Sequence, residues 1–236
     1  MNILALETST EYCSVALWQD GAITERCELA GQKHSEMLMA MIDDLLQATG
    51  HKLQAIDGIA FGMGPGSFTG VRIACGVAQG LAFGAGLPVV PVCTLAALAQ
   101  ASGAQRVVAA LDARIGEIYH ASYVRDAQGW RPVHEPSLCR AESAPPVEGS
   151  EWTGCGSAFE VYEAALRSRY GEALARVRHG LVPHARDIVV LGVESFRLGR
   201  AIAPDDAAPL YVRNKVAMTV TERARRKAGP PAAPGA

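Results

Sequence analysis

The first hundred residues alternate short apolar runs with polar or glycine-containing turns, which predicts strands followed by alternating helices and strands. Asp20-Gly21 is typical of a hairpin turn between two of the strands. Gly50 is expected to end the first helix, and Thr94 is expected to cap a later one. The expected elements are strands over 3–6, 13–18, 23–29, 56–61 and 88–92 and helices over 35–49, 70–84 and 94–101.

Beyond a boundary at Ser102-Gly103-Ala104 the order of elements is roughly repeated, although no repeat is visible residue by residue. The later elements are expected as strands over 106–111, 117–123, 130–138 and 152–155, a loop over 141–150, and helices over 159–170 and 184–200. Two such halves predict an α/β protein with two lobes, each a mixed sheet flanked by helices, as in actin and the sugar kinases (the ASKHA or RNase H-like class). The expected domains are residues 1–103, residues 104–222 and a disordered basic tail over 223–236.

The stretch from Gly62 to Gly84 is the most unusual part of the pattern. A glycine-dense turn follows a short apolar run, with Ser67 or Thr69 placed to cap the next helix. Glycine then recurs on one helix face at 76, 80 and 84, beside a second stripe of small residues at 70, 74, 78 and 82. Each interior glycine costs a helix about 1 kcal/mol relative to alanine. We therefore expect another helix or a ligand to approach this backbone closely.

The bulk composition narrows the classes of function. The chain has 236 residues, of which 49% are hydrophobic, and its net charge is −2, so it is globular and has no overall basic character. Binding of RNA is therefore expected only through a partner that supplies the positive surface. No apolar run reaches a membrane-spanning length, no signal peptide is visible, and the six cysteines are scattered, which together favour a cytoplasmic protein with reduced thiols.

Two loops could contact phosphate. Residues Glu7, Thr8, Ser9 and Thr10 follow the first strand, where related nucleotide-binding folds hold phosphate or its magnesium ion, although Ser, Thr and Glu are also ordinary turn residues. The turn from Gly62 to Gly66 lacks the Gly-Lys-Ser/Thr of a P-loop. It is either an anion cradle at a helix start or a sharp turn that needs a glycine with positive φ.

Other catalytic patterns are missing from the sequence. The histidines have no metal-ligand spacing, and no Gly-x-Ser-x-Gly elbow is present. Asp112, Arg114 and Glu117 form a polar group that belongs either to an interdomain salt-bridge network or to a cleft. Residues 211–215 are expected to be an exposed basic segment.

Four motifs, in this order, resemble those of the bacterial TsaB (YeaZ) family: 6–9 (Leu-Glu-Thr-Ser), 64–73 (Gly-Pro-Gly-Ser-Phe-Thr-Gly-Val-Arg-Ile), 111–119 and 209–213. The resemblance covers the chain to about Glu222. It implies an actin-like ATPase-type fold, paralogous to TsaD, and a role in making threonylcarbamoyladenosine at the tRNA base 3′ of the anticodon. In that system TsaD carries the catalytic site, TsaB is its required non-catalytic dimerising partner, and the ATPase TsaE joins the assembly.

The chain departs from TsaD where TsaD carries an Asn-His-x-x-x-His metal motif. The corresponding positions hold Thr94 and Leu98, and a leucine cannot bind a metal. The family therefore implies no catalytic residue, no metal and no cofactor of the chain's own, and leaves open a nucleotide at the junction with TsaD. The alternative from the fold alone is a nucleotide-dependent phosphotransferase or ATPase.

The resemblance also implies that the helices near 35–49 and 70–84 form a bundle with the matching helices of TsaD, or with a second TsaB when TsaD is absent. Small residues permit close helix approach, and flexible methionines suit a surface that accepts either partner. The opposite interpretation is that these residues only pack the lobe's own core. The expected interface residues are Met37, Met39, Met41, Leu45, Gly70, Ala74, Gly76, Val77, Gly80 and Gly84.

Overall fold

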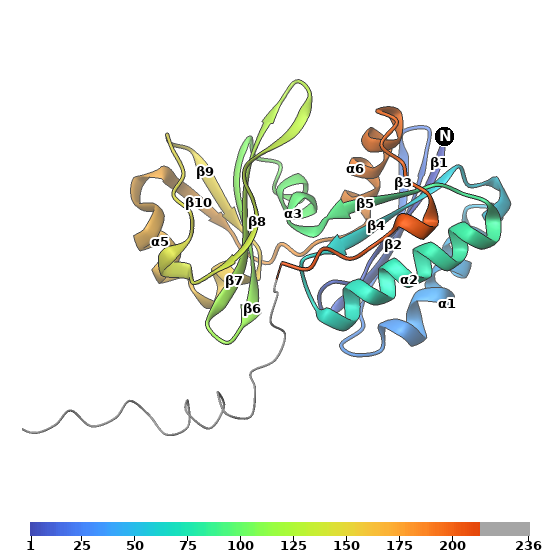
Figure 1. The fold of residues 1–236 in the computed structure, drawn as a ribbon, viewed down its shortest axis with the longest axis horizontal. Coiled ribbons are helices and arrows are strands. Elements are labelled where there is room, and N and C mark those ends of the chain that lie inside the picture. Colours follow the sequence, from blue (N-terminus) through green and yellow to red (C-terminus); the bar gives the residue numbers. More distant parts are fainter. Residues whose placement is uncertain (213–236) are drawn as a thin grey trace, which may run out of the picture.

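The computed structural model describes residues 1–212 and folds them into two lobes that lie side by side (Figure 1). The first lobe is built on a five-stranded sheet of order β3-β2-β1-β4-β5. Its strands are β1 (Asn2–Glu7), β2 (Tyr12–Gln19), β3 (Ala22–Leu29), β4 (Gly58–Gly64) and β5 (Val89–Cys93). The helices between them are α1 (His34–Ala48), the short η1 (Leu53–Ala55) and α2 (Phe68–Ala85).

Strand pairing in this sheet follows from the connections. β1, β2 and β3 form an antiparallel meander, and the predicted hairpin closes with Asp20 and Gly21 both at positive φ. β1, β4 and β5 are parallel, because a helix crosses over before each of the last two strands. Strand β4 is buried along nearly its whole length, as expected of a central strand covered on both faces.

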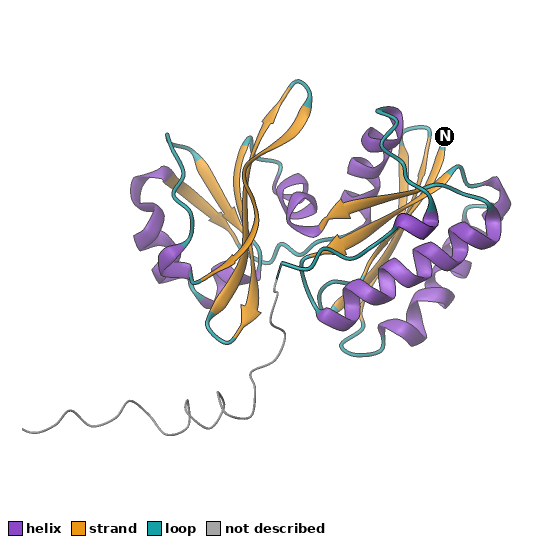
Figure 2. Ribbon diagram, in the orientation of Figure 1, coloured by secondary structure: helices purple, strands orange, loops and turns teal. Residues whose placement is uncertain are grey.

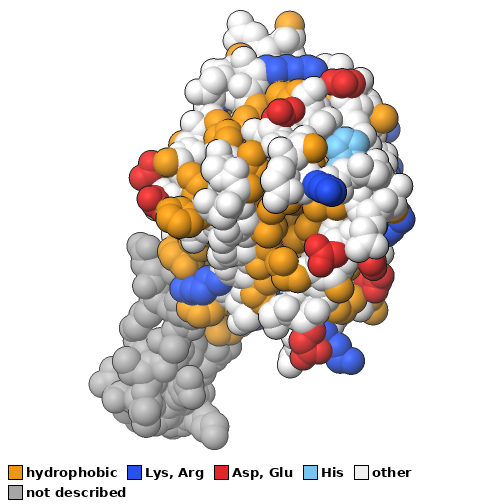
Figure 3. All heavy atoms as spheres, turned by 90° about the vertical axis from the view of Figure 1, so that its right-hand side faces the viewer, with side chains coloured by type: hydrophobic (Ala, Val, Ile, Leu, Met, Phe, Trp, Pro, Cys, Tyr) orange, Lys and Arg blue, Asp and Glu red, His pale blue; other side chains and the backbone are white. Residues whose placement is uncertain are grey.

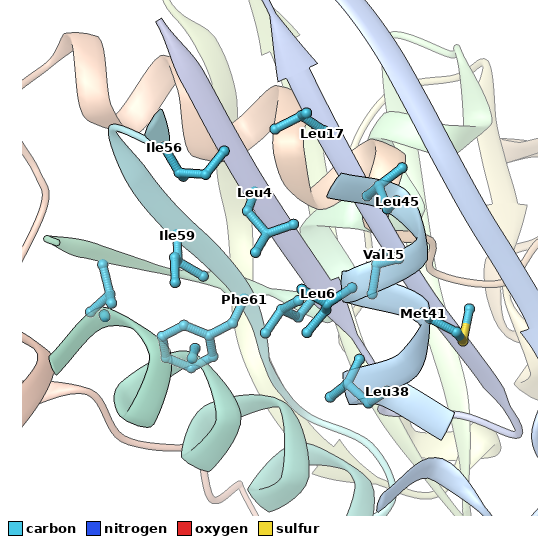
Figure 4. Packing of buried hydrophobic residues seen from close by; sticks show 14 of the residues in the cluster. Leu4, Leu6, Val15, Leu17, Leu38, Met41, Leu45, Ile56, Ile59 and Phe61 are labelled. Carbon is cyan, nitrogen blue, oxygen red and sulfur yellow. The ribbon is translucent and has the colours of Figure 1, made fainter. Parts of the chain in front are cut away.

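Helices cover both faces of the first sheet (Figure 2). On one face α1 and α2 lie over alternate strand residues, and Figure 4 shows Leu38, Met41 and Leu45 of α1 directed at the side chains of the strands. On the other face lies α6 (Ala185–Arg197), which contacts β1, β2, β4 and β5. The opposite-facing residues Ile3 and Ala5 pack there, so successive residues of β1 serve different cores.

The second lobe contains a sheet of order β10-β9-β6-β7-β8. Its strands are β6 (Arg106–Arg114), β7 (Glu117–Asp126), β8 (Gly129–Cys139), β9 (Trp152–Cys155) and β10 (Leu174–Arg178). Its helical elements are α3 (Thr94–Ser102), η2 (Ala141–Ser143), α4 (Ser157–Val161), α5 (Glu163–Tyr170) and η3 (Gly171–Ala173), and η4 (Pro204–Asp206) follows α6. α3 packs on one face of the sheet, and α4 and α5 pack on the other.

The two-lobed α/β prediction is confirmed, but several details differ. Strand β10 was not predicted, and the helix expected over 159–170 is interrupted at Tyr162. Thr94 was expected to cap α3, yet Cys93 occupies the cap position and makes no side-chain cap bond. The proposed tail over 223–236 lies outside the described residues, as do residues 213–215 of the expected basic segment.

The predicted domain division at residue 103 does not fully match the arrangement of the chain in the structure. The last described part of the chain, from α6 onward, returns to the first lobe. Ile202 pairs with Val89 of β5, and the Leu210 amide donates to the Met63 carbonyl at 2.7 Å. The second lobe is therefore an excursion of the chain that begins with α3 and ends before α6, and residues after about 184 complete the first lobe.

Helix α2 is the one described helix that is long and apolar enough to cross a membrane by length and composition, with 33% of the tested window buried. A helix that packs on a sheet passes the same test, and α2 packs on β4 through residues such as Cys75, Ala78 and Ala82.

Candidate functional site

The loop after β1, which the sequence proposes as a phosphate loop, is packed inside the protein. Glu7, Thr8 and Ser9 are each at most 2% exposed. The Glu7 carboxylate accepts a hydrogen bond from the Ser9 amide at 2.5 Å and a long one from the Thr94 hydroxyl at 3.5 Å. The Thr8 hydroxyl donates to the Gly70 carbonyl at 2.7 Å. The polar groups of Glu7 and Thr8 are thus already used within the fold.

The glycines of the following turn are explained by this packing. A Cβ at Gly62 would lie 2.0 Å from a Glu7 carboxylate oxygen, and one at Gly66 would lie 2.5 Å from the Ser9 carbonyl oxygen. Gly64 has a φ of +99°, so the predicted turn with positive φ is confirmed there. Ser67 caps α2, as expected, by accepting the Gly70 amide at 3.3 Å.

The buried carboxyl group of Glu7 dominates the electrostatics of this loop. Burial raises the pKa of Glu7, which hydrogen bonds from Ser9 and Thr94 oppose. Among the described residues, no ion pair involves Glu7. The side chains of this loop that reach solvent are Thr10 and Glu11, which lie on the wall of the cleft between the lobes.

That cleft has a volume of about 750 Å³ and takes its lining from both lobes. The first lobe contributes Glu11 and Phe68, and the second contributes Asp112, Arg114 and Glu160. Asp112 and Arg114 form an ion pair of 3.2 Å within one turn. Of the two interpretations of that polar turn, the cleft is therefore the correct one for these two residues.

The described residues contain no group of three or more His, Cys, Asp or Glu side chains arranged to hold a metal ion. Thr94 and Leu98, which the family resemblance is expected to match to the histidines of TsaD, are both fully buried. All six cysteines are free, and burial raises the pKa of the Cys13 and Cys155 thiols to about 12, so both thiols are protonated near neutral pH.

Four of the predicted interface residues lie inside the first lobe. Met41, Leu45 and Ala74 are at most 6% exposed, and Gly70 is buried where a Cβ would lie 1.9 Å from the Thr8 carbonyl oxygen. Their helix faces point at the sheet, so these four residues pack the core and are not available for contact with another chain.

The other stripe of α2 is exposed. A Cβ added at Gly76, Gly80 or Gly84 would meet no atom within 4 Å, so nothing within the described chain requires glycine there. Val77 and its neighbours one turn away on either side, Ile73 and Leu81, are only partly buried beside these glycines. The resulting surface, which we call the α2 outer face, consists of Ile73, Gly76, Val77, Gly80, Leu81 and Gly84.

Apolar side chains beyond this face extend the exposed surface. Met39 on α1 is 42% exposed, and Phe83 at the end of α2 is 73% exposed, while Met37 is partly buried. Sequence reasoning missed Phe83, whose exposure could not be inferred from its apolar character. Figure 3 shows hydrophobic side chains gathered in a band on the side of the first lobe that is away from the second, with charged side chains around it.

Comparison with known proteins gives consistent results. The family model described as TsaD: tRNA N6-adenosine threonylcarbamoyltransferase matches residues 26–221. A relative from Escherichia coli (strain K12), named tRNA threonylcarbamoyladenosine biosynthesis protein TsaB, is 40% identical over 92% of this chain and 96% of its own length. A relative of the same name from Haemophilus influenzae is 37% identical over 92% of this chain and 95% of its own.

A solved structure described as YeaZ from Pseudomonas aeruginosa has the same fold. It superposes with a TM-score of 0.81 at 38% identity and covers 89% of this chain and 99% of its own. The two mixed sheets flanked by helices are therefore the two-lobed, actin-like architecture that the motifs implied.

Proposed function

The chain belongs to the TsaB family of tRNA threonylcarbamoyladenosine biosynthesis proteins, and we propose that it acts there as a non-catalytic subunit that binds and activates TsaD together with TsaE. In this proposal TsaD supplies the catalytic site, and tRNA is reached only through the assembled complex. When TsaD is absent, two copies of this chain pair through the same surface. The subunit needs no cofactor of its own, although a nucleotide could be shared at its junction with TsaD.

The α2 outer face is the observation that carries this proposal. Its three glycines together cost the helix about 3 kcal/mol relative to alanine, and no contact within the described chain needs them. Missing side chains let a second helix approach the α2 backbone closely, and the partly buried Val77 and its neighbours supply apolar area to that contact. A partner helix accounts for both features.

The arrangement of the first loop supports a non-catalytic role. A catalytic phosphate loop needs polar groups directed at its ligand, whereas Glu7 and Thr8 are directed at the protein itself. The positions of the TsaD histidines are held by the buried Thr94 and Leu98, neither of which offers an imidazole. Chemistry is therefore left to the partner.

The test replaces Gly80 with leucine on the α2 outer face. Gly80→Leu should leave the chain folded, because its side chain enters open space, but should abolish co-elution with TsaD in size-exclusion chromatography. Ala164→Leu places the same side chain at an exposed helical position of the second lobe and serves as the matched control. In a reaction with TsaD, TsaE, tRNA and threonylcarbamoyl-adenylate, the wild type and the control should switch on modification.

Two results would overturn the proposal. Full activation of TsaD by Gly80→Leu would remove the α2 outer face as the contact surface. Unfolding of the Gly80→Leu monomer would instead show that this face packs within the chain.

The interlobe cleft favours one competing function, a nucleotide-dependent phosphotransferase or ATPase, because it has space for a small ligand between the lobes. Calorimetry with magnesium-ATP on the isolated chain separates the two. If the chain is a non-catalytic subunit, it should not hydrolyse ATP on its own. Micromolar binding of ATP with turnover would instead support the phosphotransferase or ATPase function.

A further inference from the structure

Charge is distributed very unevenly along this chain. Residues 213–236 hold six of its 22 Lys and Arg residues but one of its 24 Asp and Glu residues. That stretch therefore has a formal charge of +5, and residues 1–212 have a formal charge of −7. All six positive residues lie between Arg213 and Lys227. Such asymmetry indicates an electrostatic ligand for the basic segment.

The interlobe cleft has the complementary chemistry. Its charged lining residues are Glu11, Asp112, Arg114 and Glu160, a net excess of carboxylates. Arg114 is already paired with Asp112, and Glu160 accepts the Gly180 amide at 2.8 Å and faces His179. Glu11 is exposed and forms no ion pair among the described residues, so its carboxylate is free to accept a cation.

Aromatic rings at the rim add a second mode of cation binding. Phe68 and Tyr211 both line the cleft, and both already contact one guanidinium, that of Arg72. Phe68 and Tyr211 are each 48% exposed, and Tyr119 lines the cleft as well. Arginine side chains stack favourably on such rings. The cleft therefore offers carboxylates and aromatic faces together, a combination suited to a basic peptide.

The described chain ends inside this site, because Leu210, Tyr211 and Val212 are part of the cleft lining. We propose that the interlobe cleft is a binding site for a basic peptide and that its occupant is the segment 213–227 of the same chain. Fifteen residues span at most about 50 Å when extended, so reach does not limit the contact. Since lining residues come from both lobes, the bound segment would connect the lobes.

Weak contacts are sufficient for this arrangement. A single exposed ion pair contributes only about 0.2–1 kcal/mol. A tethered segment, however, meets its site at an effective concentration in the millimolar range, so several such pairs together keep it bound. Because the contacts are solvent-exposed, raising the ionic strength should weaken them.

The first experiment maps the contact in the full-length protein. A carbodiimide joins carboxylates to lysine amines that touch them, and the chain has lysines at 33, 52, 215 and 227. Mass spectrometry should find Lys215 or Lys227 joined to Glu11 or Glu160, with loss of the links in 0.5 M NaCl. In an equal mixture of ¹⁴N- and ¹⁵N-labelled protein, the linked peptides should carry one isotope only. Links of mixed isotope, or no links to cleft residues, would overturn the proposal.

The second experiment measures affinity. In a full-length variant, Lys215, Arg223, Arg225, Arg226 and Lys227 are all replaced by glutamine. A fluorescein-labelled peptide of residues 213–227 should bind this variant at least tenfold more tightly than the wild type, whose cleft is occupied. Adding Glu11→Gln to the variant should weaken peptide binding about two- to fivefold, as the loss of one exposed ion pair does.

The exposed Glu172, outside the cleft lining, provides the matched control. Glu172→Gln should leave the peptide affinity unchanged. Equal binding to the wild type and the neutralised variant, or equal effects of Glu11→Gln and Glu172→Gln, would show that the cleft is not the site of the basic segment. Neither experiment contains TsaD, so the outcomes are independent of the proposed activation of that protein.

Discussion

The guanidinium carbon of Arg72 lies 3.3 Å from the ring centroid of Phe68. The same guanidinium is 4.8 Å from the ring of Tyr211, and the two rings are 6.5 Å apart. Phe68 and Arg72 come from the motif at the start of α2, whereas Tyr211 comes from the motif at the end of the described chain. Two motifs separated by more than a hundred residues therefore meet in one cation–π cluster.

Removal of Arg72 should loosen the last described segment. Arg72→Ala removes the contacts to both rings and the hydrogen bond from its guanidinium to the Phe68 carbonyl, together worth about 1 kcal/mol at an exposed site. Hydrogen exchange of the Leu210 amide, which donates to Met63, should become about fivefold faster. Arg26→Ala, at an exposed site on β3, should leave it unchanged. An unchanged rate in Arg72→Ala would contradict the anchoring role.

Substitution by alanine should change the free energy of unfolding in opposite directions at two glycines of α2. Gly80→Ala adds a Cβ in open space and should raise the free energy of unfolding by about 0.5–1 kcal/mol, the difference in helix propensity. Gly70→Ala places its Cβ 1.9 Å from the Thr8 carbonyl oxygen and should lower the free energy of unfolding by about 1–3 kcal/mol. Urea denaturation measures both, and destabilisation by Gly80→Ala would mean that residue 80 is packed.

These two stripes show what periodicity could and could not decide. The sequence identifies Gly70, Ala74, Ala78 and Ala82 as one helix face and Gly76, Gly80 and Gly84 as another. It does not say which face lies on the sheet, because small residues suit either a close core contact or a close partner contact. The same uncertainty placed Met41 and Leu45 on the proposed interface, although the structure buries both.

Long-range contacts were beyond local pattern reading. Nothing near α6 in the sequence indicates that it returns to the first lobe, where Gly192 fits so closely that a Cβ would lie 2.5 Å from the Cβ of Ala60. Strand β10 was missed because Leu-Ala-Arg-Val-Arg is short and includes two arginines, and because it is an edge strand that pairs along β9 alone. Thr94 was assigned a cap by its type, but its hydroxyl reaches Glu7 instead.

A buried histidine should make the protein sensitive to mild acid. His120 is fully buried in the second lobe, its Nε2 lies 2.9 Å from the Tyr170 hydroxyl, and His134 lies beside it. Burial, followed by the charge of His134, lowers the pKa of His120 to about 4. The unfolded chain therefore binds a proton at higher pH than the folded chain does.

Above about pH 6.5 the burial of neutral His120 should therefore cost no stability. As the pH drops from 6.5 to 4, the titration of His120 should lower the free energy of unfolding by about 3 kcal/mol. His120→Gln removes this titration, so the free energy of unfolding should depend less on pH between 6.5 and 4 than it does in the wild type. Urea denaturation at several pH values measures this dependence. His179→Gln, at a half-exposed site, is the control and should keep the wild-type slope. An equal slope in His120→Gln and the wild type would contradict the assignment.

Glu7 should have the opposite effect on pH dependence. Its burial raises the folded-state pKa, so the folded chain holds its proton to higher pH, and stability is lost as the pH rises from about 4.5 through that raised pKa. Glu7→Gln is neutral throughout, and its side-chain oxygen can still accept the Ser9 amide. The variant should therefore gain stability relative to the wild type between pH 5 and 8, and should activate TsaD normally, because the carboxylate has a structural role. Loss of activation by a stable Glu7→Gln protein would instead show that this charge takes part in the function of the complex.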